Sequence, residues 1–480
     1  MTVDYVQSRE VQRQRRGVRR FIVTLLIVVS ALVATLLFLA QRQSREARLR
    51  EAGKSADAQL YRAAAMVARN RLAEAQKALV SIDRARVNPT RYAALQRALA
   101  ARASGSAPYV FDRNGGTIAV FRPASNDVAA IDDDFTPLIA REAGELTIGA
   151  RLPQLGANAT IETTLDPFVQ KAALKALAGF RGSLVAIDPR TNEVLAVASS
   201  RGKGPVANLA LEHQYEPGSV VKVVTGLNAE ISGVNLAALF PYTCKGFLEI
   251  DGRRFVDWVP QGHGTLQSLD DALAVSCNVF FADAGLRLGA DRLKRLMTAA
   301  GFDGQADLGV FQVPLGKTVG PVANHYETAL FAIGLEHETI NALHVAVLAS
   351  MMANRGELTT PKLVLQRRSV LGDAVVCGPS QRTSRLASRA AAEAIVHAMQ
   401  AVVSDPKGTG RRASVAGIST AMKTGTAGRA GGLDALILAF APVERPRIAF
   451  GIIAEDAGPA EFAGAKIAHD FLDTMQARLK

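Results

Sequence analysis

Cysteine is scarce in this sequence, with three among 480 residues, which excludes a protein held together by a disulfide framework. The 40 glycines follow no every-third period, so a collagen-like rod is excluded as well. The seven histidines include no His-Glu-x-x-His pair, and no internal repeat or low-complexity tract is present. With 49% hydrophobic and 21% charged residues, the chain predicts a large globular protein of about two to four domains.

The net charge of +12 belongs to one end of the chain. Residues 1–107 contain 20 Lys and Arg against 7 Asp and Glu, a net charge of +13. Residues 108–480 contain 36 against 37, a net charge of −1. A basic protein invites a nucleic-acid partner, but the near-neutral larger part weakens that interpretation. We therefore predict no nucleic-acid partner and expect the basic segment to lie near anionic lipid head groups.

Residues 21–40 (FIVTLLIVVSALVATLLFLA) contain no charge, which predicts one transmembrane helix. At about 1.5 Å per residue, 20 residues cross a hydrocarbon core of about 30 Å. A cleavable signal peptide is the alternative, but the run is long for one and its end lacks an A-x-A cleavage pattern. Arginines on both sides leave the charge rule nearly balanced. Since long C-terminal domains translocate largely regardless of charge, we expect residues 1–20 to be a cytoplasmic tail.

Three further segments follow the predicted span. Residues 41–107 are rich in Ala, Arg, Leu and Gln with apolar residues at helical spacing, which predicts a basic helical stalk. This stalk is either a solvated spacer or a surface for a partner. Residues 108–154 predict a short β-containing pedestal with a hairpin turn at residues 114–116. We expect residues 155–480 to form the main domain.

The main domain is predicted to be α+β, with an antiparallel sheet flanked by helices, because hairpin strands alternate with helical segments. The expected strands are residues 161–164, 183–187, 194–198, 435–440 and 448–454. The expected helices are residues 167–177, 342–353, 389–403 and 464–479.

The first candidate for chemistry is EPGSVVK, residues 216–222. The Pro-Gly pair ends the preceding segment, so Ser219 would lie at a helix N-terminus, where negative charge on its oxygen is favoured. Lys222 would lie on the same helix face, and a lysine kept neutral by burial can accept the serine proton. Taken alone, the pattern is common, and an N-cap serine beside an exposed lysine explains it equally well.

Two other segments support this candidate. In KTGT, residues 423–426, a cation and two hydroxyls on a strand can hold a carboxylate, and the glycine would let a substrate backbone approach. In SCN, residues 276–278, a hydroxyl and an amide two residues apart can relay a proton and hold a substrate amide. Ser-x-Asn is common by itself, so its weight comes from its place between the other two segments.

In this order, the three segments resemble the SxxK, SxN and KTG signatures of the penicillin-binding proteins, a family of serine D,D-peptidases and transpeptidases. The likeness covers about residues 155–480. Residues 112–115 (DRNG) resemble the point at which monofunctional, class B members leave their membrane stalk. The acidic glycosyltransferase signature of bifunctional, class A members is missing from the sequence. Further segments that resemble the family are residues 163–166, 184–189, 262–265, 332–334 and 353–356.

The resemblance implies a five-stranded antiparallel sheet with helices on both sides, and it assigns roles to the three signatures. Ser219 would be the acylated nucleophile, Lys222 its base, and Ser276 a proton shuttle. Asn278 would bind the substrate amide and Lys222, while the KTGT segment would bind the terminal carboxylate of a D-Ala-D-Ala peptide. The implied site residues are catalytic Ser219, Lys222, Ser276, Asn278 and Lys423, and substrate-binding Thr424, Gly425 and Thr426.

An oxyanion hole formed by the backbone N–H groups of Ser219 and Thr426 is also implied. The sequence departs from the family pattern at residues 335–337 (LEH), where a Gln-Gly pair is usual, and at residues 341–344 (NALH), where Thr-Pro-Leu-Gln is usual. These departures bear on the substrate groove and on the start of a helix.

The function implied is peptidoglycan D,D-transpeptidation through a Ser219 acyl-enzyme, with β-lactams as inhibitors and stem peptides as substrates. A D,D-carboxypeptidase or β-lactamase of the same fold shares the motifs and stays open. A non-catalytic scaffold or sensor in a cell-wall complex is a further alternative. The expected location is the inner, cytoplasmic membrane, crossed once, with the catalytic domain exported to the periplasm or cell exterior. Cell-wall synthesis proteins are possible partners of the stalk.

We predict no cofactor and no bound metal. Cys244, Cys277 and Cys377 show no close pairing and no metal-binding spacing in the sequence, so we expect buried free thiols. One disulfide is the alternative in an exported domain. His263 is expected to shape a loop.

Overall fold

The computed structural model describes residues 56–480 except 70, 83, 85, 86, 106, 156–158, 203, 370, 372 and 429–431. The chain divides into two compact units, residues 1–99 and 100–480. The predicted cytoplasmic tail and transmembrane segment, residues 1–20 and 21–40, lie outside the described residues. Within the described part, none of the helices has the length and apolar character needed to cross a membrane.

Helices make up the described part of the first unit, which confirms the helical character predicted for this part of the stalk. Asn88 caps the third helix, because its side-chain oxygen accepts the N–H groups of Thr90 and Arg91 at 3.0 and 3.2 Å. Leu60 and Leu79 are buried between the helices. The helices are α2 (Ala56–Ala68), α3 (Leu72–Val80) and α4 (Pro89–Ala103), the last of which ends in the second unit.

A six-stranded sheet in the second unit contains the predicted hairpin. Strands β1 and β2 pair antiparallel around the turn at residues 114–116, where Asp112 accepts the N–H groups of Asn114 and Gly116. The sheet order is β17-β16-β4-β1-β2-β3, so it takes strands from both sides of residue 154. Its strands are β1 (Ala107–Phe111), β2 (Thr117–Arg122), β3 (Asp127–Ala130), β4 (Ala159–Thr163), β16 (Val364–Ser369) and β17 (Ala374–Cys377).

A five-stranded sheet forms the centre of the second unit, in the order β19-β20-β21-β5-β6. All neighbouring strands are antiparallel, as the family resemblance implied. β21 is apolar along its whole length and β20 is apolar after Asp434, because helices cover both of their faces. The strands are β5 (Arg181–Asp188), β6 (Glu193–Arg201), β19 (Ala421–Ala427), β20 (Asp434–Ala441) and β21 (Ile448–Ala454).

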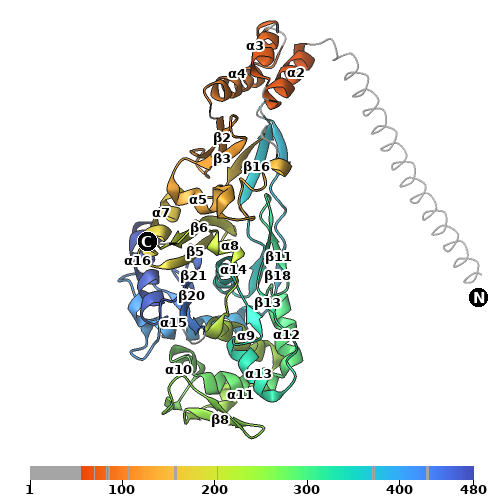
Figure 1. The fold of residues 1–480 in the computed structure, drawn as a ribbon. Coiled ribbons are helices and arrows are strands. Elements are labelled where there is room, and N and C mark those ends of the chain that lie inside the picture. Colours follow the sequence, from red (N-terminus) through yellow and green to blue (C-terminus); the bar gives the residue numbers. More distant parts are fainter. Residues whose placement is uncertain are drawn as a thin grey trace, which may run out of the picture. The chain divides into compact units, whose positions relative to one another are not determined.

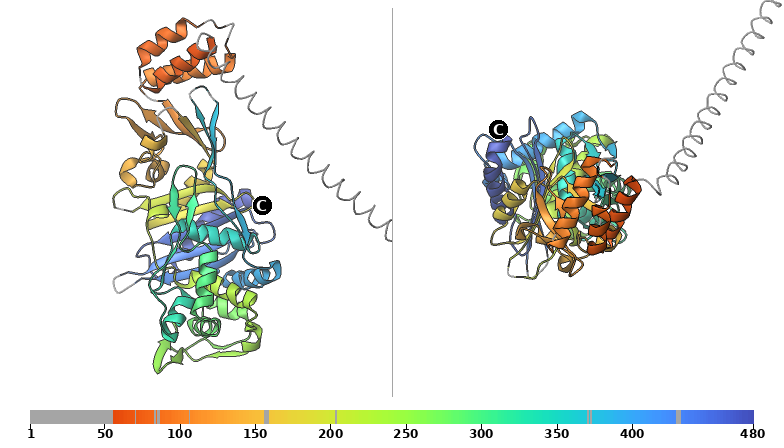
Figure 2. Two further views of the ribbon diagram at one scale, coloured as in Figure 1. Left: turned by 90° about the vertical axis from the view of Figure 1, so that its right-hand side faces the viewer. Right: turned by 90° about the horizontal axis from the view of Figure 1, so that it is seen from above.

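Helices α7 (Pro167–Ala176) and α16 (Ala463–Leu479) cover one face of this sheet, and α14 (Ala342–Ala353) packs on the other. The layers are visible in Figures 1 and 2. Side chains alternate between the two faces, so Ile437 and Phe450 contact α16 while Leu438 and Ala449 face α14. Gly451 lets α14 approach, because a Cβ there would lie 2.6 Å from the Ala342 carbonyl oxygen. The α+β prediction is therefore confirmed.

Further helices complete the second unit, and among them α15 packs against the edge strand β19. They are α8 (Leu209–Glu212), α9 (Lys222–Ser232), α10 (Leu269–Ala274), α11 (Asn278–Leu288), α12 (Ala290–Ala299), α13 (His325–Ile333) and α15 (Arg389–Ser404). Two short helices, α5 (Thr136–Ile139) and α6 (Leu152–Leu155), lie earlier in the chain. Short two-stranded sheets are formed by β7 (Tyr242–Cys244) with β10 (Gly264–Leu266), β8 (Phe247–Ile250) with β9 (Arg253–Val256), β11 (Gln305–Asp307) with β12 (Gln312–Pro314), β13 (Lys317–Thr318) with β14 (Glu338–Thr339), and β15 (Glu357–Thr359) with β18 (Thr383–Arg385).

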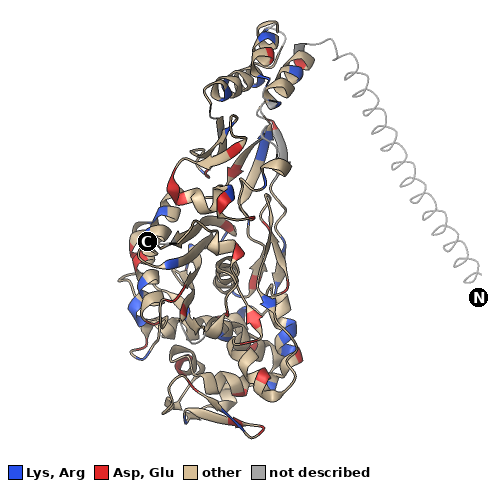
Figure 3. Cartoon of the chain, in the orientation of Figure 1, with Lys and Arg blue, Asp and Glu red and all other residues tan. Residues whose placement is uncertain are grey.

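Charged residues of both signs are interspersed over the second unit (Figure 3). This distribution agrees with the net charge of −1 counted for residues 108–480. Local placement of individual lysines, rather than overall charge, therefore decides the electrostatics of this unit.

Candidate active site

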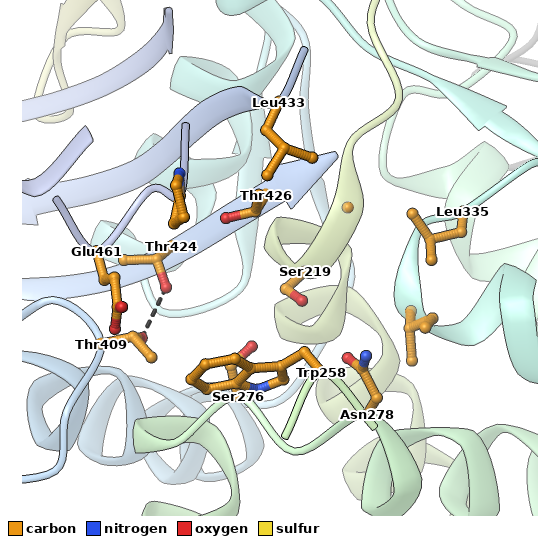
Figure 4. A pocket seen from close by; sticks show the side chains of 13 residues that line it. Ser219, Trp258, Ser276, Asn278, Leu335, Thr409, Thr424, Thr426, Leu433 and Glu461 are labelled. Carbon is orange, nitrogen blue, oxygen red and sulfur yellow. Dashed lines mark hydrogen bonds between the residues drawn. The ribbon is translucent and has the colours of Figure 1, made fainter. Parts of the chain in front are cut away.

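Ser219 lies on a 3-10 turn, Gly218–Val221, that leads directly into α9. The turn starts from Gly218 with φ +52°, and the Gly218 N–H donates to the Gly334 carbonyl at 2.8 Å. A Cβ at Gly218 would lie 2.8 Å from the Thr426 carbonyl oxygen, so the sequence needs glycine at this point. Ser219 is thereby held at the start of a helix, as predicted, and its side chain enters a cavity of about 270 Å³ (Figure 4).

Lys222 is fully buried one turn after Ser219. Its Nζ donates to the Asn278 Oδ1 and the Ser276 carbonyl, both at 2.6 Å, and lies 3.3 Å from the Ser276 Oγ. Burial lowers the pKa of Lys222 to about 8, although the charge of Asp257 opposes this shift. Among the described residues, the Lys222 Nζ bonds to Ser276 and Asn278 of the SxN segment and not to Ser219.

The SxN segment lies at the junction of α10 and α11. Ser276 has φ +56°, a left-handed conformation that is unusual for a serine and ends α10. This conformation places the Ser276 Oγ between the two lysines, because the Lys423 Nζ donates to it at 2.8 Å. Asn278 begins α11 and accepts from Lys222. The structure therefore brings Ser276 and Asn278 together with Lys222, as expected from the sequence.

The KTGT segment lies on β19, as predicted, at the edge of the five-stranded sheet. Lys423 is fully buried, and burial together with the nearby charge of Lys222 holds its pKa well below the ordinary value. The Thr424 hydroxyl bonds to that of Thr409 at 2.7 Å, and the Thr426 Oγ1 accepts the Ala460 N–H at 3.0 Å. We call Lys222, Ser276, Asn278 and Lys423 the catalytic cluster.

The structure gives a different reason for Gly425 than the expected approach of a substrate backbone. A Cβ at Gly425 would lie 2.9 Å from both the Pro217 carbonyl oxygen and the Val220 Cγ1. The glycine therefore allows β19 to pack against the turn that carries Ser219. This contact fixes the KTGT segment next to the segment that carries Ser219.

The departure at residues 341–344 preserves the start of a helix by other means. Asn341 caps α14, because its side-chain oxygen accepts the His344 N–H at 2.9 Å. His344 is fully buried, its Nδ1 accepts the Gly316 N–H, and its Nε2 lies 2.9 Å from the Ala300 carbonyl. Burial lowers its pKa to about 4, so the ring is neutral at pH 7. At residues 335–337, Leu335 lines the cavity.

Asp257 is a buried carboxylate beside the SxN segment that sequence reasoning missed. It accepts the N–H groups of Val279 and Val259 at 3.1 and 3.2 Å, and His263 Nε2 lies 3.1 Å from its Oδ1. Burial alone would raise the pKa of Asp257, but the His263 hydrogen bond and the Lys222 charge lower it to about 2. Asp257 therefore links the loop before β10 to the first turn of α11. His263 lies in that loop, as expected, and contacts Asp257.

Two cysteines that are far apart in the sequence, Cys244 and Cys277, meet at Asp257. The Sγ atoms of Cys244 and Cys277 lie 3.7 and 3.4 Å from the Asp257 Oδ2. Both are buried free thiols, as predicted, and the hydrogen bond between them lowers the pKa of Cys244 to about 6. For Cys377 the prediction stays a prediction. A separation of 33 residues hid the pair, since β7 and the SxN segment become neighbours only in the fold.

Thiols and a carboxylate are donors that zinc prefers, so this cluster bears on metal binding. The ligand atoms of Cys244, Asp257 and Cys277 lie within 4.8 Å of one another. Among the described residues these three side chains could hold a metal ion, a possibility that the sequence spacing did not indicate.

Both polar and apolar side chains line the cavity. Thr409, from the loop after α15, and Trp258, from the loop after β9, line it but carry no sequence signature. The residues that line the cavity are Gly218, Ser219, Trp258, Ser276, Asn278, Ile333, Leu335, Thr409, Thr424, Thr426, Leu433, Pro459 and Glu461. Lys222 and Lys423 do not line the cavity but bond to Ser276, which does. A serine nucleophile and hydroxyls in one cavity, with two buried lysines bonded behind them, can perform acyl transfer.

Comparison with known proteins gives an independent result. Residues 182–476 match the family described as "Penicillin binding protein transpeptidase domain". "Peptidoglycan D,D-transpeptidase PbpA" of Mycolicibacterium smegmatis is 28% identical over 337 residues, which cover 62% of this chain and 67% of that protein.

Solved structures share the fold. The D,D-transpeptidase domain of a peptidoglycan glycosyltransferase from Eggerthella lenta superposes with a TM-score of 0.67 at 24% identity, covering 78% of this chain and 99% of that one. The ceftriaxone acyl-enzyme of penicillin-binding protein A from M. tuberculosis gives a TM-score of 0.64 at 22% identity, covering 77% and 99%. These likenesses establish the fold of the second unit.

Proposed function

The chain belongs to the penicillin-binding protein transpeptidase family, and we propose that it is a monofunctional, class B-like peptidoglycan D,D-transpeptidase. The observation that carries the proposal is the catalytic cluster, in which one hydroxyl, the Ser276 Oγ, contacts lysines from the two other signatures. Ser219 opens into the same cavity. Three separate segments thus supply one connected site for acyl transfer.

In the first step, the Ser219 Oγ attacks the carbonyl carbon of the penultimate D-Ala of a stem peptide. Lys222, whose pKa of about 8 leaves part of it neutral at pH 7, accepts the serine proton. The backbone N–H groups of Ser219 and Thr426 stabilise the oxyanion. The C–N bond then breaks, and Ser276 passes a proton to the departing D-Ala amine. Lys423, Thr424 and Thr426 hold the terminal carboxylate of the peptide before it leaves.

In the second step, the amine of a neighbouring stem peptide attacks the Ser219 ester and forms the cross-link, and the Ser219 hydroxyl is restored. A β-lactam enters the same first step, but its ring-opened acyl group stays on Ser219. Hydrolysis of the ester instead of aminolysis would make the protein a D,D-carboxypeptidase or β-lactamase. A scaffold or sensor role would leave the acyl-enzyme without useful turnover.

Reconstitution separates these outcomes. The full chain in detergent is incubated with lipid-linked or polymeric pentapeptide glycan, and muropeptides are separated after digestion. We expect cross-linked dimers with the wild type and none with Ser219→Ala. Release of D-Ala without dimers would favour the carboxypeptidase, and neither product would favour the scaffold.

For the location we propose a single-pass protein of the cytoplasmic membrane, anchored by residues 21–40, with the catalytic domain exported. Support comes from 20 uncharged residues and from the basic residues that flank them. Stem peptides are found outside the membrane, so the proposed substrate requires the same orientation. External protease should digest residues 100–480 in spheroplasts and spare a tag placed before residue 20; protection of the catalytic unit would refute this topology.

The helical stalk would place the catalytic unit near the membrane and near other cell-wall synthesis proteins. Its basic charge suits anionic lipid head groups. Co-purification of such partners with the full chain, lost on deletion of residues 56–99, would support a binding role for these helices. Retention of the partners would instead favour a spacer.

A further inference from the structure

Trp258 is the only tryptophan in the chain, and it lies half-exposed in the catalytic cavity. Its exposed fraction is 49%, although large aromatic side chains are normally covered in folded proteins. An aromatic face left open inside a reaction cavity is typical of a surface that a ligand covers. The roles inferred from the three signatures do not include this residue.

The indole is held in a fixed place despite its exposure. Its Nε1–H donates to the Val275 carbonyl at 3.2 Å, and Val275 directly precedes Ser276. The ring centroid lies 5.6 Å from that of His263. The adjacent Asp257 is bonded to the Val279 N–H, so the backbone at Trp258 is tied to the first turn of α11. The ring is therefore preorganised with respect to the Ser276 side of the cavity.

The position of the indole decides which part of a substrate it can contact. In Figure 4, Ser219 lies between Thr426 above and Trp258 below, with Ser276 beside the indole. In the proposed mechanism Ser276 delivers a proton to the leaving amine, so the indole is on the amine side of the scissile bond. The acceptor amine must enter where the leaving amine departed, because the second step reverses the geometry of the first.

We infer that Trp258 is a specificity-determining residue that packs against the amine component and directs the acyl-enzyme toward aminolysis rather than hydrolysis. This inference rests on the proposed function. In aminolysis the amine nitrogen bonds to the ester carbon, the bond from that carbon to the Ser219 Oγ breaks, and the Oγ takes a proton. In hydrolysis water takes the place of the amine and a carboxylic acid is released. The apolar indole face attracts the aliphatic part of an amine and displaces water, so it favours the first route.

The partition of the acyl-enzyme tests the inference. The full chain in detergent is given an N-acyl-D-alanyl thioester as donor and D-alanine as acceptor, and the ratio of amide to acid product is measured against amine concentration. Trp258→Ala should lower this ratio about tenfold at a given amine concentration. Trp258→Phe should retain most of it, because an aromatic face remains. Val256→Ala, at an exposed site of β9 two residues before Trp258, is the matched control and should leave the ratio unchanged.

A second measurement uses the native chain, so it does not depend on whether Trp258→Ala folds. Since Trp258 is the sole tryptophan, its emission should change on acylation and change again, saturably, at the amine concentrations that raise the amide ratio. The inference would be overturned if the amide-to-acid ratio of Trp258→Ala were within twofold of the wild type. It would also be overturned if the emission of Trp258 did not change with the amine concentration. Absence of any Ser219 acyl-enzyme in the wild type would overturn the proposed function itself, and the inference with it.

Discussion

Two clusters of buried polar side chains in the second unit differ in whether their hydrogen bonds are made. In the catalytic cluster, Lys222 and Lys423 are fully buried and both bond to Ser276. In the second cluster, Glu338 of β14 is 1% exposed and neighbours His337. Neither carboxylate oxygen of Glu338, nor either ring nitrogen of His337, has a hydrogen-bond partner among the residues that the structure describes.

The difference shows how burial can serve chemistry or only cost stability. A buried polar group without a partner loses its hydration and gains nothing in return. Burial lowers the pKa of Lys222 to about 8, which leaves part of Lys222 as the neutral amine that a general base requires. Burial also raises the pKa of Glu338 well above its ordinary value, helped by the charge of Glu216, so Glu338 is kept neutral without a proposed task. Substitutions in the catalytic cluster should therefore change the rate of acylation, whereas a substitution of Glu338 should change the stability of the fold.

The largest effect should follow removal of the base from the catalytic cluster. Lys222→Ala leaves Asn278 and the Ser276 carbonyl without their donor and leaves Ser219 without its proton acceptor. We expect the second-order rate of acylation by a labelled penicillin to fall by about 10²–10⁴. Lys466→Ala changes an exposed lysine of α16 and should keep the wild-type rate. Equal rates in Lys222→Ala and the wild type would show that another group is the base.

A smaller effect should appear in the pH dependence of acylation. Only neutral Lys222 accepts a proton, so the rate should rise with pH and level off above an inflection near 8. The negative charge of Asp257 raises the pKa of Lys222, so Asp257→Asn should move the inflection to lower pH. Asp251→Asn removes an exposed carboxylate of the β8–β9 turn and should leave the inflection in place. An inflection that moves to higher pH in Asp257→Asn would contradict this electrostatic account.

The smallest effect should be a gain of stability from the second cluster. Folded Glu338 keeps its proton, whereas the unfolded chain loses it above the ordinary carboxyl pKa, so the free energy of unfolding falls as pH rises through that range. Glu338→Gln removes this penalty and should raise the Tm by about 2–4 °C at pH 7. At pH 4 the difference should vanish, because Glu338 is then protonated in both states.

Thermal unfolding at both pH values checks this prediction. Glu249→Gln, at an exposed position of β8, is the control and should not change the Tm at either pH. A lower Tm for Glu338→Gln at pH 7 would mean that the ionised carboxylate stabilises the fold, which would remove the contrast between the two clusters.

Many helices and strands of the second unit could be predicted, because they are long and have a clear pattern of apolar residues. The helix over residues 342–353 and the strand over residues 448–454 have the predicted bounds in the structure. The strand is apolar over its whole length, the helix is apolar except for His344 and Ser350, and polar or charged residues flank both elements. The six-stranded sheet was not predicted, because β16 pairs with β4 across about 200 residues and no local pattern encodes such a partner.

The three signatures could be predicted to meet, whereas their surroundings could not. Ser219, Ser276 and Lys423 belong to motifs whose residue types are set by chemistry. Asp257 and Trp258 lie in a loop without a motif, and their roles depend on contacts with α11 and with Val275. Their discovery required the fold, as did the packing reason for Gly425.

In the proposed function, the catalytic cluster activates Ser219 for acyl transfer. The most direct measurement is to incubate the full chain in detergent with penicillin, digest it, and locate the adduct by peptide mass spectrometry. We predict a single acyl adduct on Ser219, formed in the wild type and missing in Lys222→Ala over the same time. An adduct on any other residue, or no adduct in the wild type, would contradict the claim.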